Sequence, residues 1–202
     1  MNLMANHDLI GKHYDEHLEV VKDSFALLRP QILLTADLII QALASRGKVI
    51  AFGNGGSATQ ASHLVGELVG RFGKTRRPLP AIALGADTGV LTCIGNDFGY
   101  ESLYERQIEA LAQPGDIAIG FTTSGKSQNV RRGLTEAAKK DAIPIALTGA
   151  AGLEGGNAQH ILQVPSASTA CIQEVHLMIL HMWCFCIDAA FSGATRKGTQ
   201  SE

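Results

Sequence analysis

Residues 48–72 read KVIAFGNGGSATQASHLVGELVGRF, and this stretch decides the fold class. The apolar and β-branched run Lys48–Phe52 predicts a buried strand, and the small residues Gly53–Ser57 predict a tight turn after it. An amphipathic helix is expected to follow the turn. A strand, a glycine-rich loop and a helix N-terminus in this order make a corner that binds anions, because backbone N–H groups and the helix dipole point toward it.

The expected helix carries His63 and Glu67 four residues apart. This spacing places both side chains on one helix face, where an imidazole and a carboxylate suit acid/base or metal chemistry. A solvated pair that stabilises the helix by roughly a few tenths of a kcal/mol is the alternative. The position of the pair just after an anion-binding loop favours the functional interpretation, in which a small phosphorylated substrate is held at one end and reacts at the other.

The remaining sequence alternates between strand and helix signals, and its strands are short, apolar and without polar alternation. Such strands are typical of a sheet that is covered on both faces. The sequence therefore predicts an α/β fold with a doubly wound, five-stranded parallel sheet flanked by helices. The expected strands are Lys48–Phe52, Ala81–Leu84, Asp116–Phe121, Pro144–Thr148 and His160–Val164. The expected helices of this part are Ser57–Arg71, Thr88–Cys93, Ser102–Ala112, Ser127–Lys140 and Ala170–Phe191.

Two helices are expected before the first strand. The first is Leu9–Leu28, which Pro30 stops, and the second is Gln31–Ser45. At 202 residues the chain is expected to form one domain. Its expected parts are N-terminal helices that pack on the domain (1–47), the α/β core (48–192) and a polar tail (193–202).

Composition and charge narrow the class of protein. A net charge of −2 gives no electrostatic argument for a nucleic-acid partner or an anionic membrane. No uninterrupted apolar stretch approaches the roughly 18 to 20 residues of a membrane span, and His181 and Asp188 interrupt the C-terminal run. The N-terminus lacks the features of a signal peptide, and the four cysteines lack metal-site spacing and are interpreted as reduced thiols. We therefore expect a cytoplasmic protein with no nucleic-acid or membrane partner.

A second loop of the same kind follows the third expected strand. Residues 120–127, GFTTSGKS, match the nucleotide-binding pattern G-x-x-x-x-G-K-S and lie between a strand and a helix. However, no later strand ends in the aspartate that would hold magnesium, and threonine and serine fill the centre of the loop. A hydroxyl-lined cradle for a single phosphate explains these residues better. A simple strand-to-helix loop with an N-cap is the alternative.

The last expected helix supplies Gln173 and His181, eight positions apart. This separation is about 80° around a helix and roughly 12 Å along it, which is awkward for two ligands of one metal. Either Gln173 lies at a frayed helix start, or one ligand comes from another subunit. His181 stands in the apolar run LMILHMWCFCI, so a buried structural histidine is the alternative for that residue.

Two further polar groups carry weaker arguments. His13 and His17 are four residues apart, a spacing that can bind zinc. No second ligand cluster is close to them in sequence, so a pair on a helix surface is the favoured interpretation. Residues 95–99, GNDFG, predict a turn between helices. Asn96 and Asp97 could bind sugar hydroxyls from this turn, and a simple Asx-type turn is the alternative.

Several motifs resemble those of the sugar-isomerase (SIS) domain proteins, and within them those of the phosphoheptose isomerases. These motifs are GNGGS, HLVGELVGRF, IGNDFGY, TTSGKSQNV, LTG and IQEVHLMILH, and the likeness runs through nearly the whole chain. The resemblance implies an aldose–ketose isomerase that converts sedoheptulose 7-phosphate to D-glycero-D-manno-heptose 7-phosphate through an enediol, in heptose supply for lipopolysaccharide. The alternative is a non-catalytic protein with this domain, either a sugar-phosphate-binding regulator or a replication-initiation partner. Such a protein would lack the acid/base and metal residues.

The resemblance also implies a role for each candidate residue. Glu67 would be the general base and His181 the general acid, and a homotetramer would place active sites at subunit contacts, with the N-terminal helices against partner subunits. One zinc ion per subunit would be held by His63, Glu67, Gln173 and His181. The sugar phosphate would be bound by Asn54, Gly55, Gly56, Glu67, Asn96, Asp97, Thr122, Thr123, Ser124, Ser127 and Gln173. Thr122 stands where the family often has serine, and Lys126, where asparagine is common, adds a positive charge beside the phosphate.

Overall fold

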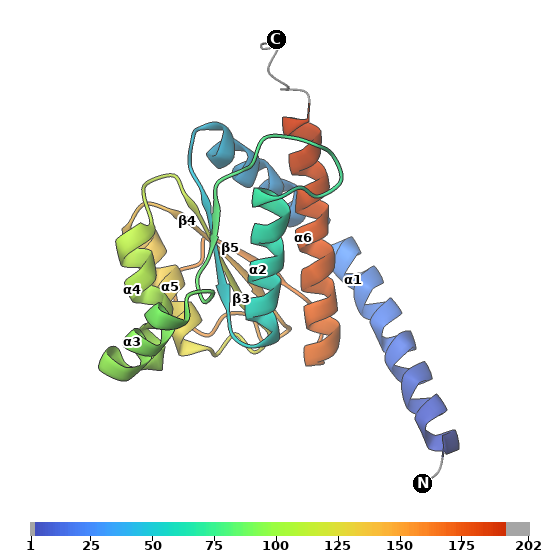
Figure 1. Ribbon diagram of the computed structural model, residues 1–202. Coiled ribbons are helices and arrows are strands. Elements are labelled where there is room, and N and C mark those ends of the chain that lie inside the picture. The colour runs from blue at the N-terminus through green and yellow to red at the C-terminus, as the bar shows by residue number, and fades with distance from the viewer. Residues whose placement is uncertain (1–2, 193–202) are drawn as a thin grey trace.

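In the computed structural model, which describes residues 3–192, helices cover both faces of a parallel sheet (Figure 1). The strand order is β2-β1-β3-β4-β5, and every neighbouring pair is parallel. The strands are β1 (Val49–Gly53), β2 (Ala81–Ala83), β3 (Ile117–Thr122), β4 (Ile143–Thr148) and β5 (His160–Gln163). The predicted doubly wound, five-stranded sheet is therefore confirmed. The predicted polar tail, 193–202, lies outside the described residues.

Helices lie at both ends of the described chain and in every connection between strands except that from β4 to β5. Helices α1, α2 and α6 pack against one face of the sheet, and α3, α4 and α5 pack against the other. The helices are α1 (Leu3–Ala44), α2 (Gly56–Val69), α3 (Thr88–Phe98), the 3-10 turn η1 (Tyr100–Ser102), α4 (Leu103–Leu111), α5 (Gln128–Lys139) and α6 (Thr169–Phe191).

Successive residues of the central strands face two separate cores. In β1, Val49 and Ala51 pack with α1, α2 and α6, whereas Ile50 and Phe52 pack with the helices of the other face. All four side chains are fully buried. Because both faces are covered, both sets of positions must be apolar, which explains why the sequence of these strands shows no polar alternation.

The N-terminal region is a single helix of 42 residues, so the predicted break at Pro30 is wrong. Leu28 and Ile32, on either side of the proline, are buried in the same core, and so is Ala36 one turn later. Pro30 itself is exposed. A proline inside a helix costs about 3 kcal/mol. Burial of the apolar face on both sides offsets this cost, since each fully buried leucine or isoleucine contributes about 1.5–3 kcal/mol.

Helix α3 continues to Phe98, so the predicted turn over residues 95–99 is also wrong. The Asp87 side chain accepts a hydrogen bond from the Val90 backbone N–H and caps the start of this helix. The helix ends at Gly99, whose φ of 82° lies in the left-handed region that favours glycine. Asn96 and Asp97 are consequently exposed residues on the last turn of a helix.

Two helices, α1 from Asp8 onward and α6, are long and apolar enough to cross a membrane by length and composition alone. The core helix of a soluble protein passes the same test. Helix α6 contributes Ile179, Leu180 and Trp183 to the core beside the sheet. Its packing therefore accounts for its apolar composition, and this test is weak support for a span.

Replacing Pro30 by alanine is expected to stabilise the protein. Alanine restores a backbone N–H inside α1 and removes the clash of the ring with the preceding turn, and the exposed position loses no packing. We expect the free energy of unfolding, measured by urea denaturation, to rise by about 1–3 kcal/mol. The matched change Leu28→Ala, two residues earlier and in the core, should lower the free energy of unfolding by about 2–5 kcal/mol. A lower denaturation midpoint for Pro30→Ala would contradict this account of the helix.

Candidate functional site

The two expected loops lie at the same edge of the sheet. Strands β1 and β3 are neighbours at its centre, and their carboxyl ends lead directly into α2 and α5. From β1 the chain runs to β2 on one side, whereas from β3 it runs to β4 on the other side. This divergence is a topological switch point, where parallel α/β sheets bind ligands. Both helix N-termini face this edge, so it favours an anionic ligand.

Hydrogen bonds within the loop after β3 fix its hydroxyl groups. The backbone N–H of Gly125 donates to Thr122 Oγ1 over 3.2 Å, and the Thr122 hydroxyl lies 3.2 Å from Ser127 Oγ. The backbone N–H of Lys126 donates to Ser124 Oγ, also over 3.2 Å. Ser127 precedes α5 but makes no side-chain capping bond to it, unlike the simple N-cap loop that was the alternative.

Gly125 allows this loop to close tightly. Its φ is 67°, and a Cβ atom added there would lie 1.7 Å from the carbonyl oxygen of Gly152. No side chain fits so close to backbone, so glycine is required at this position. The Lys126 side chain, which extends from the next residue, is exposed.

An amide and phenol network surrounds the loop after β1. The Asn54 and Asn129 carboxamides hydrogen bond to each other over 2.9 Å. The Tyr100 hydroxyl donates to Asn54 Oδ1, also over 2.9 Å, and the Tyr104 hydroxyl donates to the carbonyl oxygen of Gly53. Burial of the Tyr104 hydroxyl, with a smaller contribution from Tyr100, raises its pKa. Sequence reasoning predicted Asn54 but missed its three partners, which are more than 40 residues away in the chain.

Asn96 and Asp97 lie on α3, which η1 separates from α4. The Asn96 side chain donates to Asp97 Oδ1 over 2.6 Å, and the Cys93 thiol lies 3.7 Å from the other oxygen of Asp97. Tyr100, just after this helix, reaches Asn54 at the sheet edge. That Asn96 and Asp97 bind sugar hydroxyls stays a prediction, and they would do so from the end of a helix rather than from a turn.

Three of the predicted metal ligands come together between α2 and α6. His63 Nε2 lies 3.1 Å from Glu67 Oε1 and 3.2 Å from His181 Nε2. The ligand atoms of all three residues lie within 4.8 Å of one another. Burial lowers the pKa of His181, the neighbouring His63 lowers it further, and Glu67 acts in the opposite direction. Two imidazoles and a carboxylate are donors that suit zinc, so the residues present fit this metal.

Helices α2 and α6 lie side by side and run in the same direction (Figure 1). The Gln60 side chain donates to the Gln173 carbonyl oxygen over 2.5 Å. His63, three residues after Gln60 on α2, meets His181, eight residues after Gln173 on α6. The Gln173 side chain packs on Gly56, where an added Cβ would lie 2.6 Å from its Nε2. Because α6 begins at Thr169, Gln173 is not at a frayed helix start. A role for Gln173 as a fourth ligand stays a prediction.

The buried histidine of α6 is His176 rather than His181. His176 is fully buried, its Nε2 lies 3.3 Å from the carbonyl oxygen of Thr148, and its ring faces Phe121. Burial lowers its pKa to about 4. His176 is therefore a neutral structural side chain at physiological pH, whereas His181 is partly exposed beside His63.

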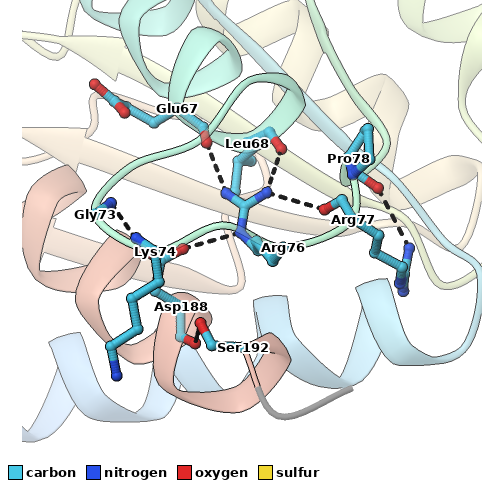
Figure 2. A network of polar contacts seen from close by, with 9 residues as sticks. All are labelled: Glu67, Leu68, Gly73, Lys74, Arg76, Arg77, Pro78, Asp188 and Ser192. Atoms are coloured by element: carbon cyan, nitrogen blue, oxygen red, sulfur yellow. Dashed lines mark hydrogen bonds and ion pairs between the residues drawn. The ribbon is translucent and has the colours of Figure 1, made fainter. Parts of the chain in front are cut away.

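A buried ion pair joins Arg76, in the loop that follows α2, to Asp188 near the end of α6 (Figure 2). Arg76 Nε donates to Asp188 Oδ1 over 2.9 Å, and the Arg76 guanidinium also donates to the carbonyl oxygens of Glu67 and Leu68, over 2.7 and 2.9 Å. The other Asp188 oxygen accepts from the backbone N–H groups of Gly73 and Lys74, both over 2.8 Å. The Arg76 side chain is only 1% exposed.

The charge of Asp188 is fully compensated. Its burial alone would raise the pKa, but the two backbone N–H groups and Arg76 outweigh burial and lower the pKa. The network holds the end of α2, where Glu67 lies, against α6. Sequence reasoning noted Asp188 only as an interruption of an apolar run. A lone acid in such a run is the signal that could have predicted a buried ion pair.

Comparisons with known proteins agree with this architecture. A family model described as SIS domain matches residues 12–149. The phosphoheptose isomerase of Aquifex aeolicus is 49% identical over 176 residues, which cover 87% of this chain and 92% of that protein. The solved phosphoheptose isomerase from Francisella tularensis has a TM-score of 0.85 at 34% identity, covering 91% of this chain and 98% of its own. The one from Neisseria gonorrhoeae has a TM-score of 0.82 at 36% identity, with the same coverage.

The parallel sheet, the two loops at its carboxyl edge and the matched family model define a SIS domain protein. The relatives above narrow the assignment, because they share a third to a half of their residues with this chain over most of its length. The chain belongs to the phosphoheptose isomerase family.

Replacing Arg76 by methionine is expected to destabilise the protein strongly. The variant leaves the Asp188 carboxylate buried without its cation, which costs about 3–5 kcal/mol. The free energy of unfolding from urea denaturation measures this loss. Lys74→Met is the matched control in the same loop, because Lys74 is exposed and contributes only its backbone N–H. If Arg76→Met lowers the free energy of unfolding no more than the control does, the ion pair does not stabilise the fold as proposed.

Proposed function

We propose that the protein is an aldose–ketose isomerase that converts sedoheptulose 7-phosphate to D-glycero-D-manno-heptose 7-phosphate. The observation that carries this proposal is the group of His63, Glu67 and His181 beside a sheet edge that suits an anion. Relatives at 40–49% identity are named phosphoheptose isomerase or probable phosphoheptose isomerase, which supports it. A role in heptose supply for lipopolysaccharide is part of the same proposal.

The phosphate of the substrate would occupy the loop between β3 and α5. Its hydroxyl groups belong to Thr122, Thr123, Ser124 and Ser127. Hydroxyls and backbone N–H groups at a helix N-terminus are suitable donors to phosphate oxygens. Gly55 and Gly56 would let the sugar approach the backbone after β1, with Asn54, Asn96, Asp97 and Gln173 as donors and acceptors for its hydroxyls.

The reaction moves a proton between two adjacent carbons through an enediol. Glu67 would remove the proton from one carbon and return it to the other, and His181 would donate a proton to the sugar oxygen and recover it. The separation of His63 from both groups, 3.1 and 3.2 Å, places a third polar side chain beside the reacting pair. Glu67 and His181 are each partly buried, which strengthens their electrostatic interactions.

A zinc ion is the proposed cofactor, with His63, Glu67 and His181 as ligands and Gln173 as a fourth. When bound, zinc would polarise the carbonyl group of the sugar. The alternative of a non-catalytic regulator or replication-initiation partner is less well supported, because such a protein has no need for a carboxylate and two imidazoles gathered in one place.

A homotetramer in the cytoplasm is proposed as the working form, with active sites at subunit contacts. Large apolar side chains are exposed along α1 and on α6, which is unusual for a monomer and suits burial against other copies. These side chains are Leu9, Ile10, Tyr14, Leu18, Phe25, Leu27, Leu33, Leu34 and Phe185. Because they recur along the length of α1 rather than singly, they support the proposed packing of the N-terminal helix on partner subunits.

Glu67→Gln is expected to lower kcat for sedoheptulose 7-phosphate by about 10²–10⁴-fold, because glutamine cannot accept the proton. The apparent affinity for the sugar phosphate should change little, since the hydroxyl loop is unaltered. Glu109→Gln, an exposed change on α4, is the control and should retain full activity. Zinc content measured on the same samples separates a lost base from a lost metal. Turnover like that of the wild type in Glu67→Gln would exclude Glu67 as the base.

Ser127→Ala is expected to raise the KM for sedoheptulose 7-phosphate by about tenfold, because a hydrogen bond to a charged group contributes about 1.5 kcal/mol or more. The change in kcat should be smaller, since the hydroxyl lies away from the reacting carbons. Thr92→Ala removes an exposed hydroxyl that bonds only within α3 and serves as control. Equal KM values for Ser127→Ala and the wild type would mean that the phosphate binds elsewhere.

A further inference from the structure

A second cluster of metal-binding side chains lies between α1 and α6. His13 Nε2 lies 3.2 Å from Glu174 Oε1, and His17 Nδ1 lies 2.7 Å from Glu174 Oε2. The ligand atoms of His13, Glu16 and Cys171 also lie within 4.8 Å of one another. His13 belongs to both sets, which bring His13, Glu16 and His17 of α1 close to Cys171 or Glu174 of α6.

This convergence changes the interpretation of His13 and His17. In sequence they are an isolated pair on a helix surface, because Glu174 is 161 residues away from His13. In the fold a single carboxylate contacts both imidazoles, and the side chains are only partly exposed, 45% for His13, 32% for His17 and 41% for Glu174. An ordinary surface ion pair needs one partner for the carboxylate, whereas here two nitrogen donors approach its two oxygens.

Each imidazole nitrogen lies close enough to a Glu174 oxygen for the two to be ligands of one ion. Zinc binds nitrogen and oxygen at about 2.0–2.2 Å in a tetrahedral arrangement, so two of its ligand atoms are about 3.3 Å apart. The pairs His63–Glu67 and His63–His181 have separations of 3.1 and 3.2 Å. The His13–Glu174 separation of 3.2 Å is in the same range, and the His17–Glu174 separation of 2.7 Å is shorter, as in a direct hydrogen bond.

In the single chain, a groove beside the cluster gives an ion access to it. A groove of about 790 Å³ runs between α1 and α6, and its walls include His13, His17 and Glu174. His181 lines the same groove. Apolar side chains such as Leu177 and Met178 form much of the rest of the wall, so the polar groups in it are concentrated at these few positions.

We propose that His13, His17 and Glu174 form a second divalent transition-metal site, distinct from the group at His63, with Glu16 and Cys171 beside it as further donors. Imidazole, carboxylate and thiolate suit zinc and similar ions rather than calcium or magnesium, which prefer oxygen alone. The bound ion joins α1 to α6 by coordination bonds and fixes the N-terminal half of α1 on the domain. This site does not depend on the proposed isomerase activity.

Zinc binding to the full-length protein tests this site. After removal of metals with a chelator, zinc chloride alone is titrated by calorimetry, and the metal that remains after gel filtration is measured by mass spectrometry. We expect about two equivalents per chain for the wild type and about one for the double variant His13→Asn with His17→Asn. In the wild type zinc should also raise Tm more than it does in the double variant, because the second ion binds only the folded chain.

Four further variants keep the outcomes distinguishable. His63→Asn should also retain about one equivalent, and its combination with the double variant should retain none. His160→Asn removes a partly buried histidine on β5 that belongs to neither group of metal-binding side chains, and should bind as the wild type does. Glu174→Gln, which keeps the size of the side chain, should weaken the second equivalent at least about tenfold.

Unchanged zinc stoichiometry in the double variant, both alone and with His63→Asn, would overturn the second site. If instead the wild type binds about one equivalent and the double variant binds none, the second site stands and the zinc at His63 in the proposed function fails. Circular dichroism of each variant verifies that its fold is intact, which the partial exposure of His13 and His17 leads us to expect.

Discussion

The register between α2 and α6 is the constraint on which the candidate site depends. His63 and Glu67 lie on one helix and His181 on the other, so neither helix alone assembles the group. A slip by one helical turn would move a side chain by about 5.4 Å, more than the 4.8 Å that encloses the three ligand atoms. Gln60 and Gln173 fix one end of the pair of helices, and Arg76 and Asp188 fix the other. A buried ion pair adds little net stability compared with apolar packing, so its contribution here is mainly to geometry.

The sequence alone predicted the fold well because the sheet is covered on both faces. Short apolar runs that end in glycine or hydroxyl residues have few other interpretations when helical segments alternate with them. The errors are at Pro30 and at residues 95–99, where local breaking signals were followed too literally. In both places a buried face continues past the signal, as with Leu28 and Ile32 around the proline. Such tertiary burial is invisible in a local window.

The candidate site was predictable where its residues follow a strand or share a helix face. The hydroxyl loop and the pair His63–Glu67 are of this kind. The distant partners were not predictable from spacing, since Tyr100 and Asn129 reach Asn54, and Arg76 reaches Asp188, only through the folded chain. Helix geometry predicted that Gln173 and His181 lie too far apart along one helix to bind the same metal easily. In the structure they are separated in this way, with Gln173 beside Gly56 and His181 beside His63.

The long helices α1 and α6 carry apolar side chains both in the core and on the exposed surface. One face of each packs on the sheet, where Thr35 of α1 accepts a hydrogen bond from the buried Trp183 indole of α6 over 3.0 Å. The other face of α1 leaves residues such as Ile10 and Leu27 more than half exposed. Because α1 carries apolar residues on both sides, it is apolar enough to pass a composition test for membrane spans. For the same reason its sequence does not show that the helix continues past Pro30. Both observations have the same cause, because the exposed side of α1 carries large apolar side chains, as surfaces that contact other proteins do.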